Sequence, residues 1–352
     1  IPGSLVGSEM CIRDRGHTLG LRHNFKASWL YNASDIHNKD ITGNNHIGSV
    51  MDYDPINIAP EGVEQGNYFP TEPGPYDIWA ITFGYTQDMK DADRENLLSQ
   101  STKPELIFGT DDDAMGSPGS NTDPRNKRYD MSSDPITYTV QRLQIIDNKI
   151  NELPEIFNEP GSTYTELKAT FDSLLRDKGR FAESIAIQIG GVYSNRLVVG
   201  QESGMTPFEV VPYTEQKRAM NALNDYLFAN DAFVFSPDIL KLLQSEKRAA
   251  SYGNSDDDPK VHDRVLRMQM SALSFILHPR VMKRLTNSSK YGNEYLPDEV
   301  LQDIFDGIFV AREIPNTFKM NLQSAYVDGL IAAMADERYD EISRSAIFNS
   351  LI

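Results

Sequence analysis

The chain has 352 residues, of which 39% are hydrophobic and 24% charged, a composition typical of a globular protein large enough for two domains. Its formal net charge of −17 argues against nucleic acid as a partner, because binding to phosphates needs a basic face. No run of about 18 apolar residues occurs, so we expect no transmembrane segment, and a single cysteine, Cys11, excludes an intrachain disulfide.

The first stretch that indicates chemistry is 16–25, which reads GHTLGLRHNF. His17 and His23 stand six residues apart with Gly20 between them, which is the spacing of the last two ligands in a H-E-x-x-H-x-x-G-x-x-H zinc site. Imidazole nitrogens are common zinc ligands, and a glycine can end a helix in a conformation that other residues avoid. We therefore predict that His17 and His23 bind one metal ion, with Gly20 turning the chain between them.

The upstream half of this motif is missing. Counting back from His17, the first ligand and the general base would stand at positions that hold Arg13 and Asp14, and an arginine has no lone pair to offer a metal. Residues 4–15, SLVGSEMCIRDR, resemble translated sequencing-adapter sequence and show no helical periodicity. We therefore expect residues 1–15 to be a non-native segment at the start of an N-terminally truncated fragment. The alternative is a genuine N-terminus whose histidine spacing is coincidental.

Two further histidines lie in or near the stretch 35–45, which is rich in Asn, Asp and Gly. Such a composition predicts a surface loop. We expect His37 and His46 to be solvated loop histidines and not ligands.

The next motif is Ser-x-Met-x-Tyr, with Met51 and Tyr53 about thirty residues after the histidine pair. It resembles the Met-turn of the metzincin metalloproteases, in which a methionine lies beneath the zinc-binding histidines as an apolar floor. In some branches a tyrosine two residues later ligates zinc or stabilises the oxyanion, and Tyr53 stands at that spacing. The alternative is that both residues are ordinary core residues in a turn.

Residues 75–85, PYDIWAITFGY, combine apolar residues at helical spacing with a proline near the start, so we predict a helix. The run resembles the C-terminal helix of astacin-like catalytic domains. Asp77 then either anchors this helix beneath the site or is an ordinary acidic residue at a helix start.

Together these motifs resemble bacterial zinc-dependent metalloproteases with an EcxA-type metzincin zinc-binding domain, over about residues 16–85. The resemblance implies a zinc metalloendopeptidase with one catalytic zinc ion, which hydrolyses peptide bonds in proteins or peptides through a zinc-activated water. It also implies an extracytoplasmic location: periplasm, cell surface or secreted. Since the first histidine and the glutamate are missing, we expect this chain itself to be inactive. The alternative function is a non-catalytic interaction module with a decayed zinc site.

An acidic stretch, 109–124, follows, with clustered carboxylates that could bind calcium: Asp111, Asp112, Asp113 and Asp123. Their spacing is not that of an EF-hand, and a solvated linker is the alternative interpretation.

The remaining chain has apolar residues at helical spacing and several helix-start signals, notably Asp134-Pro135 and a capping box from Thr163 to Glu166. We predict a mainly α protein, in which the C-terminal part of a metzincin catalytic domain is followed by an irregular multi-helix domain. The predicted divisions are a non-native segment (1–15), the C-terminal half of the catalytic domain (16–108), an acidic linker (109–130) and a helical C-terminal domain (131–352).

Overall fold

The computed structural model describes residues 3–114, 118–120, 122–201, 203–245 and 258–352. Contacts divide the chain into two compact units. Unit 1 contains residues 1–139, 190–212 and 291–293, and unit 2 contains residues 140–189, 213–290 and 294–352. The predicted domain boundaries remain a prediction, because contact-based units do not test where a domain of the parent family begins or ends.

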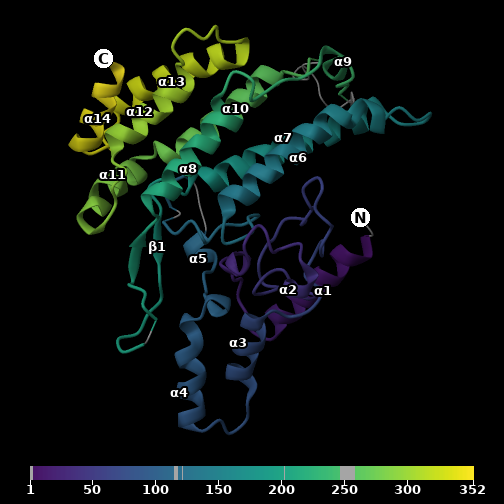
Figure 1. Ribbon diagram of the computed structural model, residues 1–352, viewed down its shortest axis with the longest axis vertical. Helices are drawn as coiled ribbons and strands as arrows, with labels where there is room; N and C mark the ends of the chain where they lie inside the picture. The colour runs from purple at the N-terminus through teal and green to yellow at the C-terminus, as the bar shows by residue number, and fades with distance from the viewer. Residues whose placement is uncertain (1–2, 115–117, 121, 202, 246–257) are drawn as a thin grey trace. The chain divides into compact units, whose positions relative to one another are not determined.

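Unit 1 consists of α-helices of 4 to 16 residues joined by long irregular segments (Figure 1). Its α-helices lie at α1 (Gly3–Thr18), α2 (Lys39–Thr42), α3 (Pro75–Tyr85), α4 (Asp91–Ser99) and α5 (Asp111–Ala114). Its single helical turns lie at η1 (Ala27–Trp29), η2 (Gln100–Thr102) and η3 (Pro104–Leu106). Its sheet has two antiparallel strands, β1 (Val192–Ser194) and β2 (Phe208–Val210), with Tyr193 opposite Glu209.

Buried asparagine side chains hold the irregular segments of unit 1 together. Asn24 is fully buried, its side-chain amide donates to the carbonyl oxygen of Ile107 at 3.0 Å, and its side-chain oxygen accepts from the backbone N–H of Gly109 at 3.1 Å. Asn57, also fully buried, donates to the carbonyl oxygen of Asn67 at 3.1 Å. Such bonds satisfy buried backbone groups that a helix or sheet would otherwise pair.

Unit 2 is helical and has a continuous apolar core. The helices are α6 (Pro135–Ile156, which begins in unit 1), α7 (Tyr164–Ala186), α8 (Tyr213–Leu223), η4 (Asn224–Phe228, a π-turn), α9 (Pro237–Leu240), α10 (Val261–Ile276), α11 (Pro279–Ser288), η5 (Ser289–Tyr291, at the edge of the unit), α12 (Pro297–Ile308), α13 (Thr317–Ala335) and α14 (Glu341–Leu351). Helix α10 packs against α7 and α13, and α12 packs against α14. The fully buried residues Phe171, Val265 and Leu322 contribute to this core.

The mainly α fold and the predicted helix starts are confirmed. Thr163 and Glu166 form the predicted capping box at the start of α7, with the backbone N–H of Glu166 donating to Oγ1 of Thr163 at 3.1 Å. Asp134 accepts from the backbone N–H of Thr137 at 3.1 Å at the start of α6. Within the described ranges, no helix has both the length and the apolar character needed to cross a membrane.

Two expectations differ from the structure. Helix α1 extends back to Gly3, although the sequence there shows no apolar periodicity. The expectation of solvated histidines is wrong, because His37 is 8% exposed and His46 is fully buried. Loop-forming composition describes the backbone, but the segments around these histidines fold over their side chains.

Candidate functional site

The histidine pair lies at the end of α1. The helix ends at Thr18, and Gly20 follows with a φ of +87°, a conformation that residues with a Cβ atom rarely adopt. The chain then reverses, and the rings of His17 and His23 lie with centroids 4.8 Å apart in a T-shaped arrangement. Nδ1 of His17 donates to the carbonyl oxygen of Leu21 at 3.0 Å, so the neutral ring carries its lone pair on Nε2.

His23 is held by a carboxylate from a distant segment. Its Nδ1 donates to both oxygens of Asp111, at 3.0 and 2.9 Å. Burial raises the pKa of Asp111, but the hydrogen bond and charge of His23, together with Arg22, outweigh burial and hold that pKa below its ordinary value. Nε2 of His23 is buried and has no hydrogen-bond partner within the described residues. In the neutral ring, this carboxylate holds the proton on Nδ1 and the lone pair lies on Nε2, which is the arrangement of a supported metal ligand.

Met51 lies directly against the end of α1. It is fully buried, and a Cβ atom added to Gly16 would fall inside the contact distance of its sulfur. A side chain at position 16, one residue before His17, would therefore force the buried Met51 side chain to move. The carbonyl oxygen of Met51 accepts from the backbone N–H of Asn24 at 3.1 Å, which ties the turn to the residue after His23.

Asp77 connects the methionine turn to α3. Its carboxylate accepts from Oγ of Ser49 at 2.5 Å, from the N–H of Val50 at 2.9 Å and from the N–H of Gly74 at 2.8 Å. Burial raises the pKa of Asp77, and these three hydrogen bonds act in the opposite direction. The two interpretations of this residue are thus compatible, because Asp77 caps α3 and also binds the turn.

Tyr53 lies beside the histidine pair, and Arg13 covers it. The ring centroids of Tyr53 and His23 are 4.7 Å apart, and the guanidinium of Arg13 lies 4.8 Å from the Tyr53 ring centroid. Nε of Arg13 donates to the carbonyl oxygen of Val50 at 3.0 Å. Arg13 thus occupies the place in which the sequence motif requires the first metal ligand.

The sequence did not predict a buried His–Asp pair that lies next to Arg13. Nε2 of His46 lies 3.3 Å from Oδ2 of Asp54, and both side chains have no exposed surface. The other oxygen of Asp54 lies 4.0 Å from Nη2 of Arg13. No spacing rule joins positions 46 and 54, so only the position of Asp54 directly after Tyr53 hinted at this pair.

A family model described as Met-zincin matches residues 10–315, which is most of the chain. The chain belongs to the Met-zincin family. The match confirms the resemblance to metzincin-type zinc metalloproteases and extends it from residues 16–85 into the helices of unit 2. It also includes residues 10–15 of the segment expected to be non-native. Comparisons with curated proteins and with solved structures give no match.

The residues of this Met-zincin do not complete a catalytic zinc site. His17 and His23 supply two nitrogen ligands, whereas catalytic zinc sites hold three protein ligands. Position 13 carries a cation that cannot ligate, and within the described ranges no three His, Cys, Asp or Glu residues are grouped so as to hold a metal ion. The unpartnered Nε2 of His23 fits zinc, but the residues present supply one protein ligand fewer than a catalytic zinc site needs.

The acidic stretch engages basic side chains instead of forming a cluster. Asp112 pairs with Arg22 at 3.1 Å, and Asp113 pairs with Arg196 at 2.7 Å. Asp123 lies 2.7 Å from Lys26. With Asp111 on His23, each of the four carboxylates suggested for calcium has a basic or imidazole partner, and no three carboxylates among the described residues are grouped so as to hold a metal ion. Residues 115–117 and 121 of this stretch lie outside the described residues.

Proposed function

We propose that this chain carries the zinc-binding part of a Met-zincin endopeptidase, in which His17 and His23 are metal ligands and Tyr53 is a catalytic residue. The observation that supports the proposal is the imidazole pair itself: two rings 4.8 Å apart, each with Nδ1 engaged. The buried Met51 lies against Gly16, the residue before His17. A single ion of zinc, the metal on which the family depends, would supply the Lewis acid for peptide hydrolysis. Its substrates would be proteins or peptides, and its location extracytoplasmic.

The chain's own residues suit parts of this chemistry. The Tyr53 phenol is a hydrogen-bond donor next to His23, as stabilisation of an oxyanion requires. Asp111 fixes the orientation of the His23 ring, and Asp77 fixes the turn that carries Met51. Asp14 stands where the motif has glutamate, and its side chain is one methylene shorter.

A second candidate function is a non-catalytic interaction module with a decayed site. The observation that favours it is the fit of Arg13, which bonds to the carbonyl of Val50 and lies over Tyr53. If Arg13 is native, the guanidinium is an integral part of the fold, and unit 2 would act through contacts with a partner.

The deciding experiment restores the motif with the double variant Arg13→His, Asp14→Glu in the full chain. If the proposal is right, zinc titration by calorimetry goes from weak binding in the original chain to one tightly bound ion. Casein cleavage then appears as well. Adding His17→Ala as the matched control should abolish both gains. No increase in zinc affinity would refute the proposed ligands, and tight zinc without any cleavage would favour the interaction module.

A further inference from the structure

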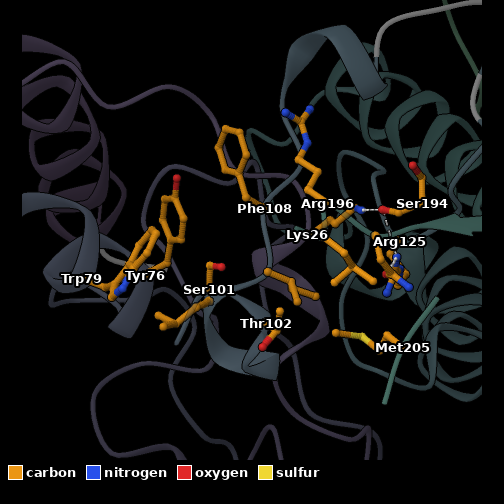
Figure 2. A pocket seen from close by; sticks show the side chains of 14 residues that line it. Lys26, Tyr76, Trp79, Ser101, Thr102, Phe108, Arg125, Ser194, Arg196 and Met205 are labelled. Atoms are coloured by element: carbon orange, nitrogen blue, oxygen red, sulfur yellow. Dashed lines mark hydrogen bonds between the residues drawn. The ribbon is translucent and has the colours of Figure 1, made fainter. Parts of the chain in front are cut away.

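A cavity of about 240 Å³ in unit 1 has no role in the proposed function. Figure 2 shows Tyr76 and Trp79 on one side of it and Lys26 and Arg125 on the opposite side. Phe108 and Arg196 lie next to each other between these two sides. The 14 lining residues include three cations and no carboxylate, in a protein whose net charge is −17.

The aromatic side chains of the cavity contact one another. The rings of Tyr76 and Phe108 stack with centroids 5.5 Å apart and an interplanar angle of 10°. Trp79 lies 5.9 Å from Tyr76, and its Nε1 donates to the carbonyl oxygen of Leu97 at 2.9 Å. Rings held in this way offer an apolar surface to a ligand with little loss of side-chain entropy on binding.

The opposite side carries buried positive charge. Nζ of Lys26 and Nη2 of Arg125 lie 2.7 and 2.8 Å from the same oxygen of Asp123. The two cationic side chains are only 6% and 11% exposed. Burial and the charge of Arg125 lower the pKa of Lys26, and Asp123 acts against them. Nζ of Lys26 also donates to the carbonyl oxygen of Ser194 at 2.8 Å, and Nη2 of Arg125 donates to Oδ1 of Asn195 at 2.8 Å. Two basic side chains thus share one carboxylate on this side of the cavity, where low dielectric strengthens their attraction for an anion.

Arg196 is the accessible cation. Its side chain is 57% exposed, its Nη2 lies 2.7 Å from Asp113, and its guanidinium centre lies 5.4 Å from the centroid of Phe108. A guanidinium has five N–H donors in a planar fork, so an ion pair through one nitrogen leaves directions for a second carboxylate. Arg196 thus places a carboxylate-binding group at the edge of the aromatic surface.

The cavity is connected to the histidine pair through a short stretch of chain. Phe108 lines the cavity, and Asp111, three residues later, accepts from His23. Three consecutive Cα–Cα steps of about 3.8 Å span at most about 11 Å. A residue that lines the cavity therefore lies within about 11 Å, Cα to Cα, of the residue that holds His23.

We propose that this cavity binds a peptide carboxylate carried next to an aromatic or apolar side chain. The carboxylate belongs either to the C-terminal residue of the peptide or to an acidic side chain beside an aromatic residue. Cations bind the carboxylate, and the stacked rings contact the side chain. The inference rests on the proposed function only in taking a peptide as the ligand, since binding here needs neither His17, His23 nor a metal.

Three peptides test the inference by calorimetry on the full chain without added metal: N-acetyl-Ala-Phe with a free carboxylate, the same peptide as its amide, and N-acetyl-Asp-Phe-amide. At least one of the two carboxylate peptides should bind about tenfold more tightly than the neutral amide, the effect of one charge-assisted hydrogen bond. Whichever of the two binds more tightly identifies the source of the carboxylate. Equal affinity of all three peptides, or no binding, would overturn the inference.

In the variant Arg196→Gln, the ratio between the affinities for the carboxylate peptide and for the neutral amide should fall about tenfold, because one charge-assisted hydrogen bond is lost. Arg22→Gln is the matched control, because Arg22 is a similarly exposed arginine paired with the neighbouring Asp112. An unchanged preference in Arg196→Gln, or an equal loss in Arg22→Gln, would contradict a specific pocket. The peptide titrations use no zinc. The inference about the cavity can therefore stand if the motif-restoring variant fails to bind zinc, and the proposed zinc ligands can stand if the peptides fail to bind.

Discussion

At the scale of single residues, the site depends on side chains that position other side chains. Asp111 is the clearest case, since it accepts from Nδ1 of His23, and in the neutral ring this bond leaves the lone pair on Nε2, which has no partner among the described residues. Asp112, its neighbour, instead pairs with Arg22 at a surface where the carboxylate side chain is 77% exposed. The two aspartates are adjacent in sequence, but only Asp111 acts on a proposed ligand.

The difference predicts unequal effects of the same substitution. In the motif-restored chain, Asp111→Asn should lower zinc affinity about 10–100-fold, because the support of His23 is weakened. Asp112→Asn should leave the affinity within about twofold, since an exposed ion pair contributes little. Competition with a chromogenic chelator measures both. Equal losses in the two variants would show that the charge of the loop, and not the bond to His23, matters.

A buried carboxylate predicts how stability depends on pH. Burial raises the pKa of Asp130 to about 8, although a hydrogen bond from Oγ of Ser28 and the charge of Lys127 act against it. Asp52 is also fully buried, and burial together with the charge of Asp130 raises its pKa, so the two carboxyl groups titrate as a pair. Since the unfolded value is about 4, the native state keeps a proton that the unfolded chain releases. The resulting stability is complete below about pH 4 and is lost as the pH rises toward 8.

We therefore expect the melting temperature to fall between pH 5 and pH 8. The melting temperature of the Asp130→Asn variant should fall less, because its amide stays neutral over this range. Circular dichroism melts at several pH values measure the two slopes. Asp91→Asn, which removes an exposed carboxylate in α4, should keep the original slope. Identical slopes for Asp130→Asn and the original chain would show that Asp130 does not hold the proton that this buried pair retains on folding.

Sequence reasoning succeeded where a function needs fixed spacing. The positions of His17, Gly20 and His23 predicted a helix end, a glycine turn and two rings in proximity, and the structure has all three. It did not predict Asp111 as the partner of His23, since that bond joins residues 88 apart. Nor did it predict the burial of His46, because the loop composition around that residue says nothing about what folds over it.

At the scale of elements, the turn around Met51 and helix α3 act together. A Cβ atom added to Gly74, the residue before α3, would fall inside the contact distance of the backbone carbonyl of Gly48. The N–H of Tyr76 donates to that same carbonyl at 3.0 Å. The start of α3 therefore closes directly onto the backbone that precedes the turn, and the fixed apolar spacing of 75–85 predicted the helix but not this contact.

This contact predicts that Gly74→Ala destabilises the chain by about 1–3 kcal/mol, the usual effect of overpacking, because backbone must move to make room. Gly84→Ala, near the end of the same helix, places its Cβ in open space and should stabilise by up to about 1 kcal/mol. Urea unfolding followed by tryptophan fluorescence compares the two, since Trp79 lies on α3. Destabilisation by Gly84→Ala as well would point to a general effect of helix substitution.

At the scale of the whole molecule, the two units differ in how their backbones are satisfied. In unit 2, long helices such as α7 and α10 bond internally and bury apolar side chains against each other. In unit 1, residues 16–60 run mostly through turns, and side chains such as Asn57 accept or donate in place of regular structure. Leu19 and Ile56 of that stretch are 45% and 39% exposed. Apolar spacing and helix-start residues predicted the helices of unit 2. Hydrogen bonds between side chains and backbone far apart in the sequence, such as those in unit 1, leave no pattern in the neighbouring residues.

Hydrogen exchange should report this difference directly. Backbone amides of residues 16–60 should exchange well before those of 163–190, because turns held by single side-chain bonds open locally while a packed helix opens only with its unit. Mass spectrometry of peptides from the native chain measures both stretches in one experiment, and α3 provides an internal control for a helix within unit 1. Equal protection of 16–60 and 163–190 would mean that the asparagine and aspartate bonds of unit 1 stabilise its turns as firmly as helical packing stabilises α7.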